Sequence, residues 1–106
     1  MSDSAALVLV TCGSEAEARS VARQLVEDRL AAGVQIVPIS SIYTWKEQVV
    51  EDQEHLLICK TRTALYEDIE STVTQLHSYE VPPILMLEID RASDPYSEWI
   101  RASTGD

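Results

Sequence analysis

Basic residues and glycine are both scarce in this chain of 106 residues. Eight lysines and arginines stand against 18 aspartates and glutamates, so the formal net charge is -10. A protein that binds a nucleic-acid backbone needs clustered Lys and Arg side chains to displace counterions, and an anionic membrane selects for the same clusters. We therefore expect neither partner. The three glycines, Gly13, Gly33 and Gly105, are too few and too scattered for a glycine-rich phosphate loop.

Cysteines and long hydrophobic runs are also few. Cys12 and Cys59 each lie inside a short apolar run, with no C-x-x-C or His-rich context, so we expect two inert core thiols. The beginning of the sequence, MSDSAALVLV, has no basic region, and its apolar run is too short for export or for crossing a membrane. We predict a cytoplasmic protein.

The first segments of regular structure are a strand and a helix. The apolar, β-branched run over residues 6–12 is typical of a strand buried on both faces. Ser14 and Glu17 form the pattern of a capping box, and apolar residues then recur at helical spacing as far as residue 30. Gly33 stands where a left-handed C-cap is expected.

A long hairpin is predicted next. Residues 34–45 are rich in β-formers, and Pro38 places this strand at an edge or at a bulge because proline donates no backbone hydrogen bond. The polar stretch 46–54 contains the turn, and residues 55–61 return as the partner strand.

The last third of the chain predicts a helix, a strand and a short final helix. Thr63 is the expected N-cap of a helix over residues 65–76, and the two prolines that follow forbid its continuation. Residues 84–89 form a fourth strand, and Asp94 with the proline after it opens a helix through residue 100. The order β-α-β-β-α-β plus a helix predicts one α+β domain over residues 1–106, a ferredoxin-like antiparallel sheet with its helices on one face.

Few histidines or carboxylates in the sequence stand in a pattern that is typical of catalysis. Neither His55 nor His77 stands in a nucleophile motif, and we expect no enzyme. The acidic run that ends at Glu54 fits a solvated turn better than an acid/base pair, because nothing in the sequence predicts its desolvation.

A group of aromatic and polar residues at the ends of elements does stand out. Alternate residues on a strand share a face, and the loop before the two prolines can meet that face. We hypothesise one ligand-binding cleft, assembled between subunits, whose basic groups favour a carboxylate or phosphate. The alternative is structural, with the aromatic residues anchoring an interface and the lysine paired to a glutamate. The candidate residues are Tyr43, Trp45, Lys60, Arg62, His77, Tyr79 and Glu80.

Five stretches, in this order and spacing, carry a resemblance to a known family. They are LVEDRLAAGVQIVP, SIYTW, LLICKTR, LHSYEVPPIL and YSEWI. Together they run through nearly the whole chain and closely resemble the CutA family of divalent-cation tolerance proteins. The resemblance implies a homotrimer of ferredoxin-like subunits, similar in architecture to PII signalling proteins, in which the long hairpin joins the sheet of a neighbour.

The resemblance also implies a link to divalent metals, copper especially, but the sequence departs from the family at the metal site. A Cys, His and Glu ligand set has been proposed for copper in the family, and those positions align here with Val10, Leu76 and Pro83, none of which can coordinate a metal. The remaining candidates for Cu²⁺ or another divalent cation are His77, Glu80 and Cys12. Two functions stay open, a metal-tolerance protein and a signalling or scaffolding trimer that holds a small anion or a protein partner.

Overall fold

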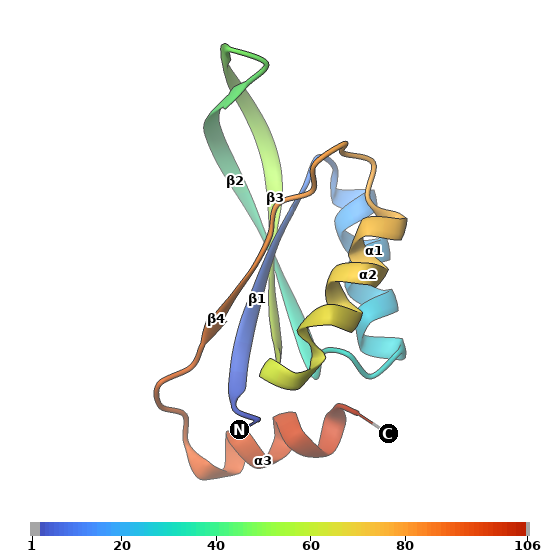
Figure 1. Cartoon of the computed structure of the whole chain (residues 1–106), viewed down its shortest axis with the longest axis vertical. Coiled ribbons are helices and arrows are strands. Elements are labelled where there is room, and N and C mark those ends of the chain that lie inside the picture. Colours follow the sequence, from blue (N-terminus) through green and yellow to red (C-terminus); the bar gives the residue numbers. More distant parts are fainter. Residues whose placement is uncertain (1–2, 106) are drawn as a thin grey trace.

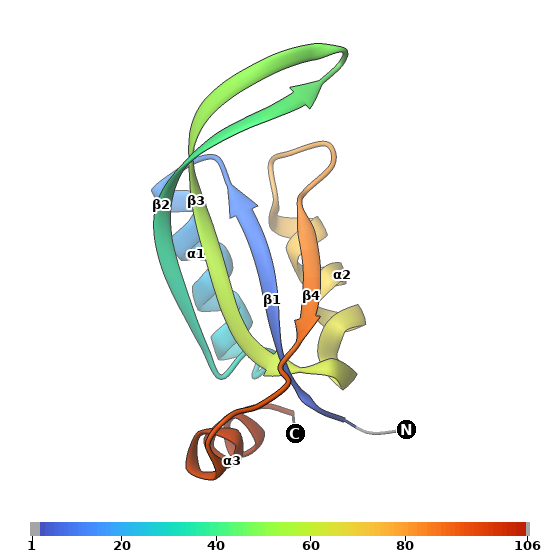
Figure 2. The same ribbon diagram turned by 90° about the vertical axis from the view of Figure 1, so that its left-hand side faces the viewer.

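An antiparallel sheet of four strands, in the order β2-β3-β1-β4, is the framework of the computed structural model, which describes residues 3–105. Helices α1 and α2 lie together on one face of the sheet, and α3 crosses its lower end (Figures 1 and 2). This α+β architecture confirms the predicted element order and the additional C-terminal helix. The strands are β1 (Ala5–Cys12), β2 (Gly33–Trp45), β3 (Gln48–Arg62) and β4 (Ile84–Glu88), and the helices are α1 (Glu15–Glu27), α2 (Tyr66–Leu76) and α3 (Asp94–Ser103), with a 3-10 turn at Thr63–Leu65.

Burial alternates along β1. Val8, Val10 and Cys12 are fully buried against the helices, whereas the residues between them are half-buried. The prediction of a strand buried on both faces is therefore wrong, because both sheet-packed helices cover the same face (Figure 1). The other face, which no helix covers, is called the open face below.

The start of α1 is capped as predicted, but only by one of the two expected bonds. Ser14 Oγ accepts a hydrogen bond from the Glu17 N–H at 3.1 Å. The Glu17 carboxylate does not return to Ser14; it accepts from the backbone N–H of Ser78 at 2.7 Å and from the Ser78 hydroxyl at 3.2 Å. Glu17 thereby ties α1 to the loop that follows α2.

The end of α1 differs from the prediction. The helix ends at Glu27, and the left-handed residue after it is Arg29, with φ 60°, whereas Gly33 begins β2. The Arg29 guanidinium donates to two carbonyls at the end of α3, those of Ala102 (3.0 Å) and Gly105 (2.7 Å). These tertiary bonds stabilise a non-glycine residue in this conformation, so the prediction of a Gly33 cap is wrong.

The β2–β3 hairpin is longer than predicted on its returning strand. Pairing runs without interruption from Gly33 opposite Lys60 to Trp45 opposite Gln48. The turn consists only of Lys46 and Glu47, which both have positive φ (52° and 66°), as two-residue hairpin turns require. The polar stretch after the turn is therefore strand, and the proline of β2 is accommodated because β2 is an edge strand.

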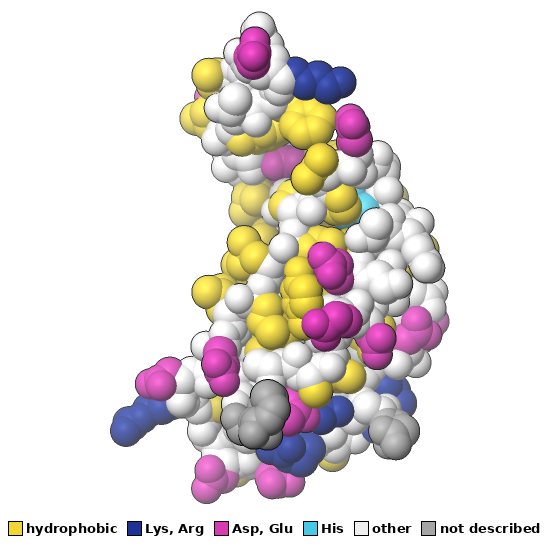
Figure 3. All heavy atoms as spheres, viewed as in Figure 1, with side chains coloured by type: hydrophobic (Ala, Val, Ile, Leu, Met, Phe, Trp, Pro, Cys, Tyr) yellow, Lys and Arg dark blue, Asp and Glu magenta, His cyan; other side chains and the backbone are white. Residues whose placement is uncertain are grey.

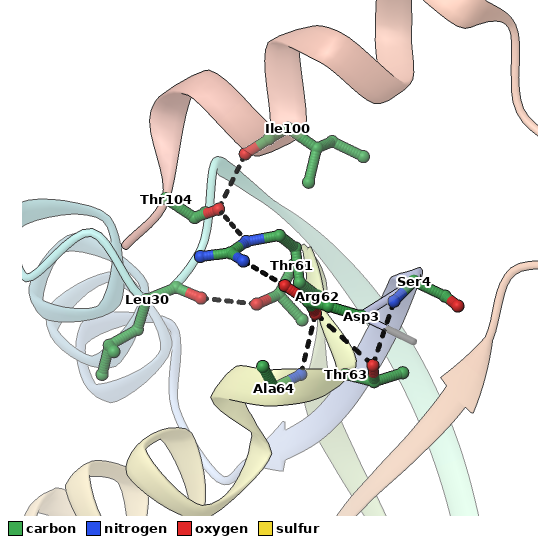
Figure 4. A network of polar contacts seen from close by, with 9 residues as sticks. All are labelled: Asp3, Ser4, Leu30, Thr61, Arg62, Thr63, Ala64, Ile100 and Thr104. Carbon is green, nitrogen blue, oxygen red and sulfur yellow. Dashed lines mark hydrogen bonds and ion pairs between the residues drawn. The ribbon is translucent and has the colours of Figure 1, made fainter. Parts of the chain in front are cut away.

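A polar network joins the beginning of β1 to the end of β3 (Figure 4). Asp3 accepts from the Ala64 N–H at 3.1 Å and pairs with the Arg62 guanidinium, while Thr63 Oγ1 accepts from the Ser4 N–H. Asp3, and not Thr63, therefore satisfies the first turn after β3. Burial opposes ionisation of Asp3, but the Ala64 bond and the Arg62 charge outweigh it and hold its pKa below the ordinary value of 3.8.

The helix boundaries near the C-terminus are set by local bonds. The N-cap of α3 is Ser93, whose hydroxyl accepts from the Tyr96 N–H, and Asp94 is already the first helical residue. The predicted Asp94 cap is wrong by one residue because serine supplies the acceptor. Ile100 is the buried residue of α3, and Leu76 ends α2 before the two prolines. None of the helices in residues 3–105 has the length and apolar character needed to cross a membrane.

Candidate functional site

A cavity of about 580 Å³ lies beneath the hairpin and is called the hairpin pocket below. Two aromatic residues of β2 and the loop between α2 and β4 form its walls, and one residue of β3 completes it. The lining residues are Tyr43, Trp45, Glu54, Tyr79, Glu80, Val81 and Pro83. Four of the seven predicted cleft residues are thus brought together within a single chain, and these are Tyr43, Trp45, Tyr79 and Glu80.

Local geometry explains why these side chains converge. Tyr43 and Trp45 are two residues apart on β2, so they project to the same face of the hairpin. The hairpin extends past the end of β1 and bends over the α2–β4 loop (Figure 2). A backbone hydrogen bond from the Thr11 N–H to the Pro83 carbonyl, at 3.4 Å, attaches that loop to the end of β1.

Two phenol–carboxylate contacts supply the polar groups of the site. The Tyr79 hydroxyl donates to Glu54, and the Tyr43 hydroxyl donates to Asp52 at 2.5 Å. Glu54 is only 5% exposed, and in residues 3–105 no Lys, Arg or His forms an ion pair with it. The pocket therefore contains a desolvated carboxylate whose charge no basic side chain balances.

The carboxylates also change the acidity of the phenols. Hydrogen bonding to Asp52, together with some desolvation, raises the pKa of Tyr43 to about 12. Burial, followed by the hydrogen bond to Glu54, raises the pKa of Tyr79 still further above its ordinary value. Both hydroxyls consequently remain protonated donors at neutral pH.

His77 is close to the pocket but does not line it. His77 is 9% exposed; its Nε2 lies 2.6 Å from the Thr11 carbonyl oxygen, and its Nδ1 accepts from the Tyr79 N–H at 3.1 Å. These contacts require the neutral tautomer with the proton on Nε2. His77 therefore positions the backbone and the ring of Tyr79, whose centroid lies 4.7 Å from its own.

Lys60 and Arg62 lie at the opposite end of β3 from the hairpin turn. Lys60 Nζ contacts the Gln35 side-chain oxygen, and Arg62 contacts Asp3 and, at 2.8 Å, Thr104 Oγ1 (Figure 4). Within one chain neither residue reaches the hairpin pocket. To take part in the pocket, Lys60 and Arg62 would have to come from a neighbouring subunit. Their contacts with Gln35, Asp3 and Thr104 would then have to break.

Glu54, Val81 and Pro83 line the pocket but were not among the predicted site residues, and Glu54 is the charged one of the three. The acidic run that contains it predicts a solvated turn, but the hairpin pairing continues past it, and Tyr79 covers it. No local pattern marks Glu54 as buried, because its partner Tyr79 lies 25 residues further along the chain.

Two of the three candidate metal ligands, Cys12 and His77, lie in a cluster with Glu17. The ligand atoms of Cys12, Glu17 and His77 all lie within 4.8 Å of one another, and Glu80 is not among them. Burial, and then the charges of Glu17 and Glu54, raise the pKa of the Cys12 thiol to about 12, so a thiolate is disfavoured. Both nitrogens of His77 and both oxygens of Glu17 have partners. These residues do not fit a resident divalent ion.

Comparison with known proteins places this geometry in context. Residues 6–103 match the model of the family described as CutA1 divalent ion tolerance protein. The chain is 48% identical to the divalent-cation tolerance protein CutA of Thermus thermophilus over 93% of its own length and 97% of the relative's. It is 39% identical to human protein CutA over 95% of its own length but spans only 57% of that relative. The solved structure of the Thermus thermophilus protein superimposes with a TM-score of 0.92 at 47% identity, covering 95% of this chain and 99% of the other.

Proposed function

Since this chain belongs to the CutA1 divalent ion tolerance family, we propose that it acts in tolerance to divalent metals such as copper, as a cytoplasmic homotrimer, without catalysis. The hairpin pocket carries the proposal, because it combines concave apolar walls with a few convergent polar groups, as ligand sites do. Its phenols stay protonated, and the nearby Cys12 thiol does too, so no activated nucleophile stands among the described residues around it. These features favour binding over chemistry.

The proposed role does not depend on a resident metal ion. In the ligand cluster beside the pocket, Glu17 and His77 are engaged in hydrogen bonds and the Cys12 thiol is protonated. We propose instead that the protein contributes to the metal response by binding a ligand or partner in the hairpin pocket. A calorimetric titration with Cu²⁺ and Zn²⁺ tests this point, and tight binding that Cys12→Ser abolishes would contradict it.

The open face of the sheet supports the homotrimer. Leu85 and Leu87 are 50% and 49% exposed there, and the hairpin exposes Ile42 and Val49 at 69% and 77%. Hydrophobic side chains gather along this side of the molecule, from the hairpin down the sheet (Figure 3). A soluble chain rarely leaves so extended an apolar surface and two free sheet edges without a partner. Other copies of the chain are the partner that we propose.

Light scattering tests the assembly directly. We expect a mass near 35 kDa, three times the 11.8 kDa subunit. Leu87→Asp should shift the mass toward that of the subunit because it places a charge in the proposed interface. Val26→Asp, on the partly exposed surface of α1, is the matched control and should leave the mass unchanged. A wild-type monomer at micromolar concentration would overturn the proposal.

The role in metal tolerance is tested in cells. Cells that lack the protein should lose tolerance to copper and regain it when the wild-type chain is returned. Trp45→Leu, which removes one wall of the pocket, should fail to restore growth, whereas Val26→Asp should restore it fully. If Trp45→Leu is trimeric and restores growth as well as the wild type does, the hairpin pocket is not the working site.

A further inference from the structure

The walls of the hairpin pocket are aromatic on two sides. Tyr43 and Trp45 come from β2, and Tyr79 comes from the loop that faces them. Aromatic faces carry negative potential and attract a cation that lies within about 6 Å of the ring centroid. The chain itself provides an example, because Lys46 Nζ lies 5.7 Å from the centroid of the Trp45 ring, although Lys46 does not line the cavity.

The charge inside the pocket has the same sign as the aromatic faces. Glu54 and Glu80 are the charged residues among those that line it, and no basic side chain of residues 3–105 accompanies them. Glu54 has the Tyr79 hydroxyl as its hydrogen-bond partner at 5% exposure, which leaves most of its acceptor capacity unused. A buried carboxylate without a counter-charge is costly, so a positively charged ligand that reaches it gains a strong partner.

We propose that the hairpin pocket binds an organic cation, a protonated amine carried on an apolar body; this identifies the ligand class of the site proposed above and rests on that function. The ammonium group donates to Glu54 and lies between the aromatic rings, while Val81 and Pro83 contact the apolar body. The two glutamates repel an anion, and the largely apolar walls favour a cation with an apolar body over a metal ion, which gives up its water shell reluctantly. The cavity, at about 580 Å³, has room for a ligand of this kind.

Calorimetry with three ligands of matched shape tests the proposal on the assembled protein. The probes are 2-phenylethylamine, the neutral 2-phenylethanol and the anion 3-phenylpropionate, at neutral pH. We expect the amine to bind at least about tenfold more tightly than either of the others, because only it forms a charge-assisted bond to a desolvated carboxylate. Glu54→Gln keeps an acceptor for Tyr79 but removes the charge, so it should weaken amine binding about tenfold.

Two further variants keep the test decisive if Glu54→Gln folds poorly. Glu80→Gln, on an exposed loop residue, should also weaken binding of the amine and leave that of the alcohol unchanged. Glu67→Gln, in the exposed first turn of α2, makes the same charge change away from the pocket and should have no effect.

The outcomes separate this inference from the proposed function. Equal binding of amine and alcohol, preference for 3-phenylpropionate, or binding of Cu²⁺ or Mg²⁺ with none of the amine would each overturn the organic-cation proposal. If Trp45→Leu nevertheless fails to restore copper tolerance in cells, the pocket remains the working site and only its ligand class is wrong. If the variant restores growth fully, the proposed function fails whatever the pocket binds.

Discussion

Replacing Gly13 with alanine probes how the phenol of Tyr79 is held against Glu54. A Cβ atom at position 13 would lie 2.9 Å from the Tyr79 hydroxyl oxygen and 3.2 Å from its Cε1. Gly13 does not have a positive φ, so the backbone tolerates alanine and the side-chain contact decides the effect. We expect Gly13→Ala to push the phenol away and to leave Glu54 without its hydrogen-bond donor.

The structure bounds the size of the effect. Overpacking of a methyl group costs about 1–3 kcal/mol, and leaving a buried carboxylate without its donor costs at least about 1–3 kcal/mol. Tyr79→Phe removes the hydrogen-bond donor of Glu54 but introduces no overpacking, so only the second cost applies to it. It also removes the oxygen at 2.9 Å and leaves a ring carbon at 3.2 Å, a contact that a shift of a few tenths of an ångström relieves. Gly13→Ala should therefore cost less than about 1 kcal/mol in the Tyr79→Phe background.

Denaturant unfolding of four proteins measures this coupling. The wild type, both single variants and the double variant are compared at one subunit concentration, because the unfolding of an oligomer depends on concentration. Tyr96→Phe is the control, since its 41% exposed side chain is outside the pocket, and it should change the free energy of unfolding by less than about 0.5 kcal/mol. If the Gly13 and Tyr79 effects add within about 0.5 kcal/mol, alanine does not displace the phenol and the reasoning is refuted.

Three further predictions concern other parts of the chain. Cys12 and Cys59 are buried, and burial raises the pKa of each thiol to about 12. A bulky maleimide at pH 8 should therefore label neither thiol in the native state and both in denaturant. Rapid labelling of the native protein would contradict this. Because the native pKa of Asp3 is below its ordinary value, its carboxylate stabilises the fold above that value and loses this contribution as the pH falls through the native pKa. Asp3→Asn should therefore reduce the loss of stability below about pH 4, and an unchanged pH profile of unfolding would contradict it. Replacing Lys46 and Glu47 together by Asn-Gly should raise the free energy of unfolding by about 1 kcal/mol, since both have positive φ; a decrease would show that their side chains outweigh the backbone cost.

Local patterns were sufficient for the order of the elements. The helical spacing after Ser14 marked α1, and Pro38 limited its strand to an edge or a bulge, because each feature acts on neighbouring residues or on the strand's own backbone. The same reasoning failed where a distant segment decided the outcome. Arg29 takes the left-handed position after α1 because carbonyls of α3 bind its side chain, and no pattern near residue 29 shows this.

The sequence alone determined the fold class, and it predicted that Tyr43, Trp45, Tyr79 and Glu80 lie together, as they do around the hairpin pocket. Alternation on a strand and the position of a loop are short-range properties, which a sequence displays directly. Only the tertiary structure decided the charge of that site. It places Glu54 inside and the basic residues at the far end of β3, because the bend of the hairpin and the path of the loop depend on contacts between segments far apart in the chain.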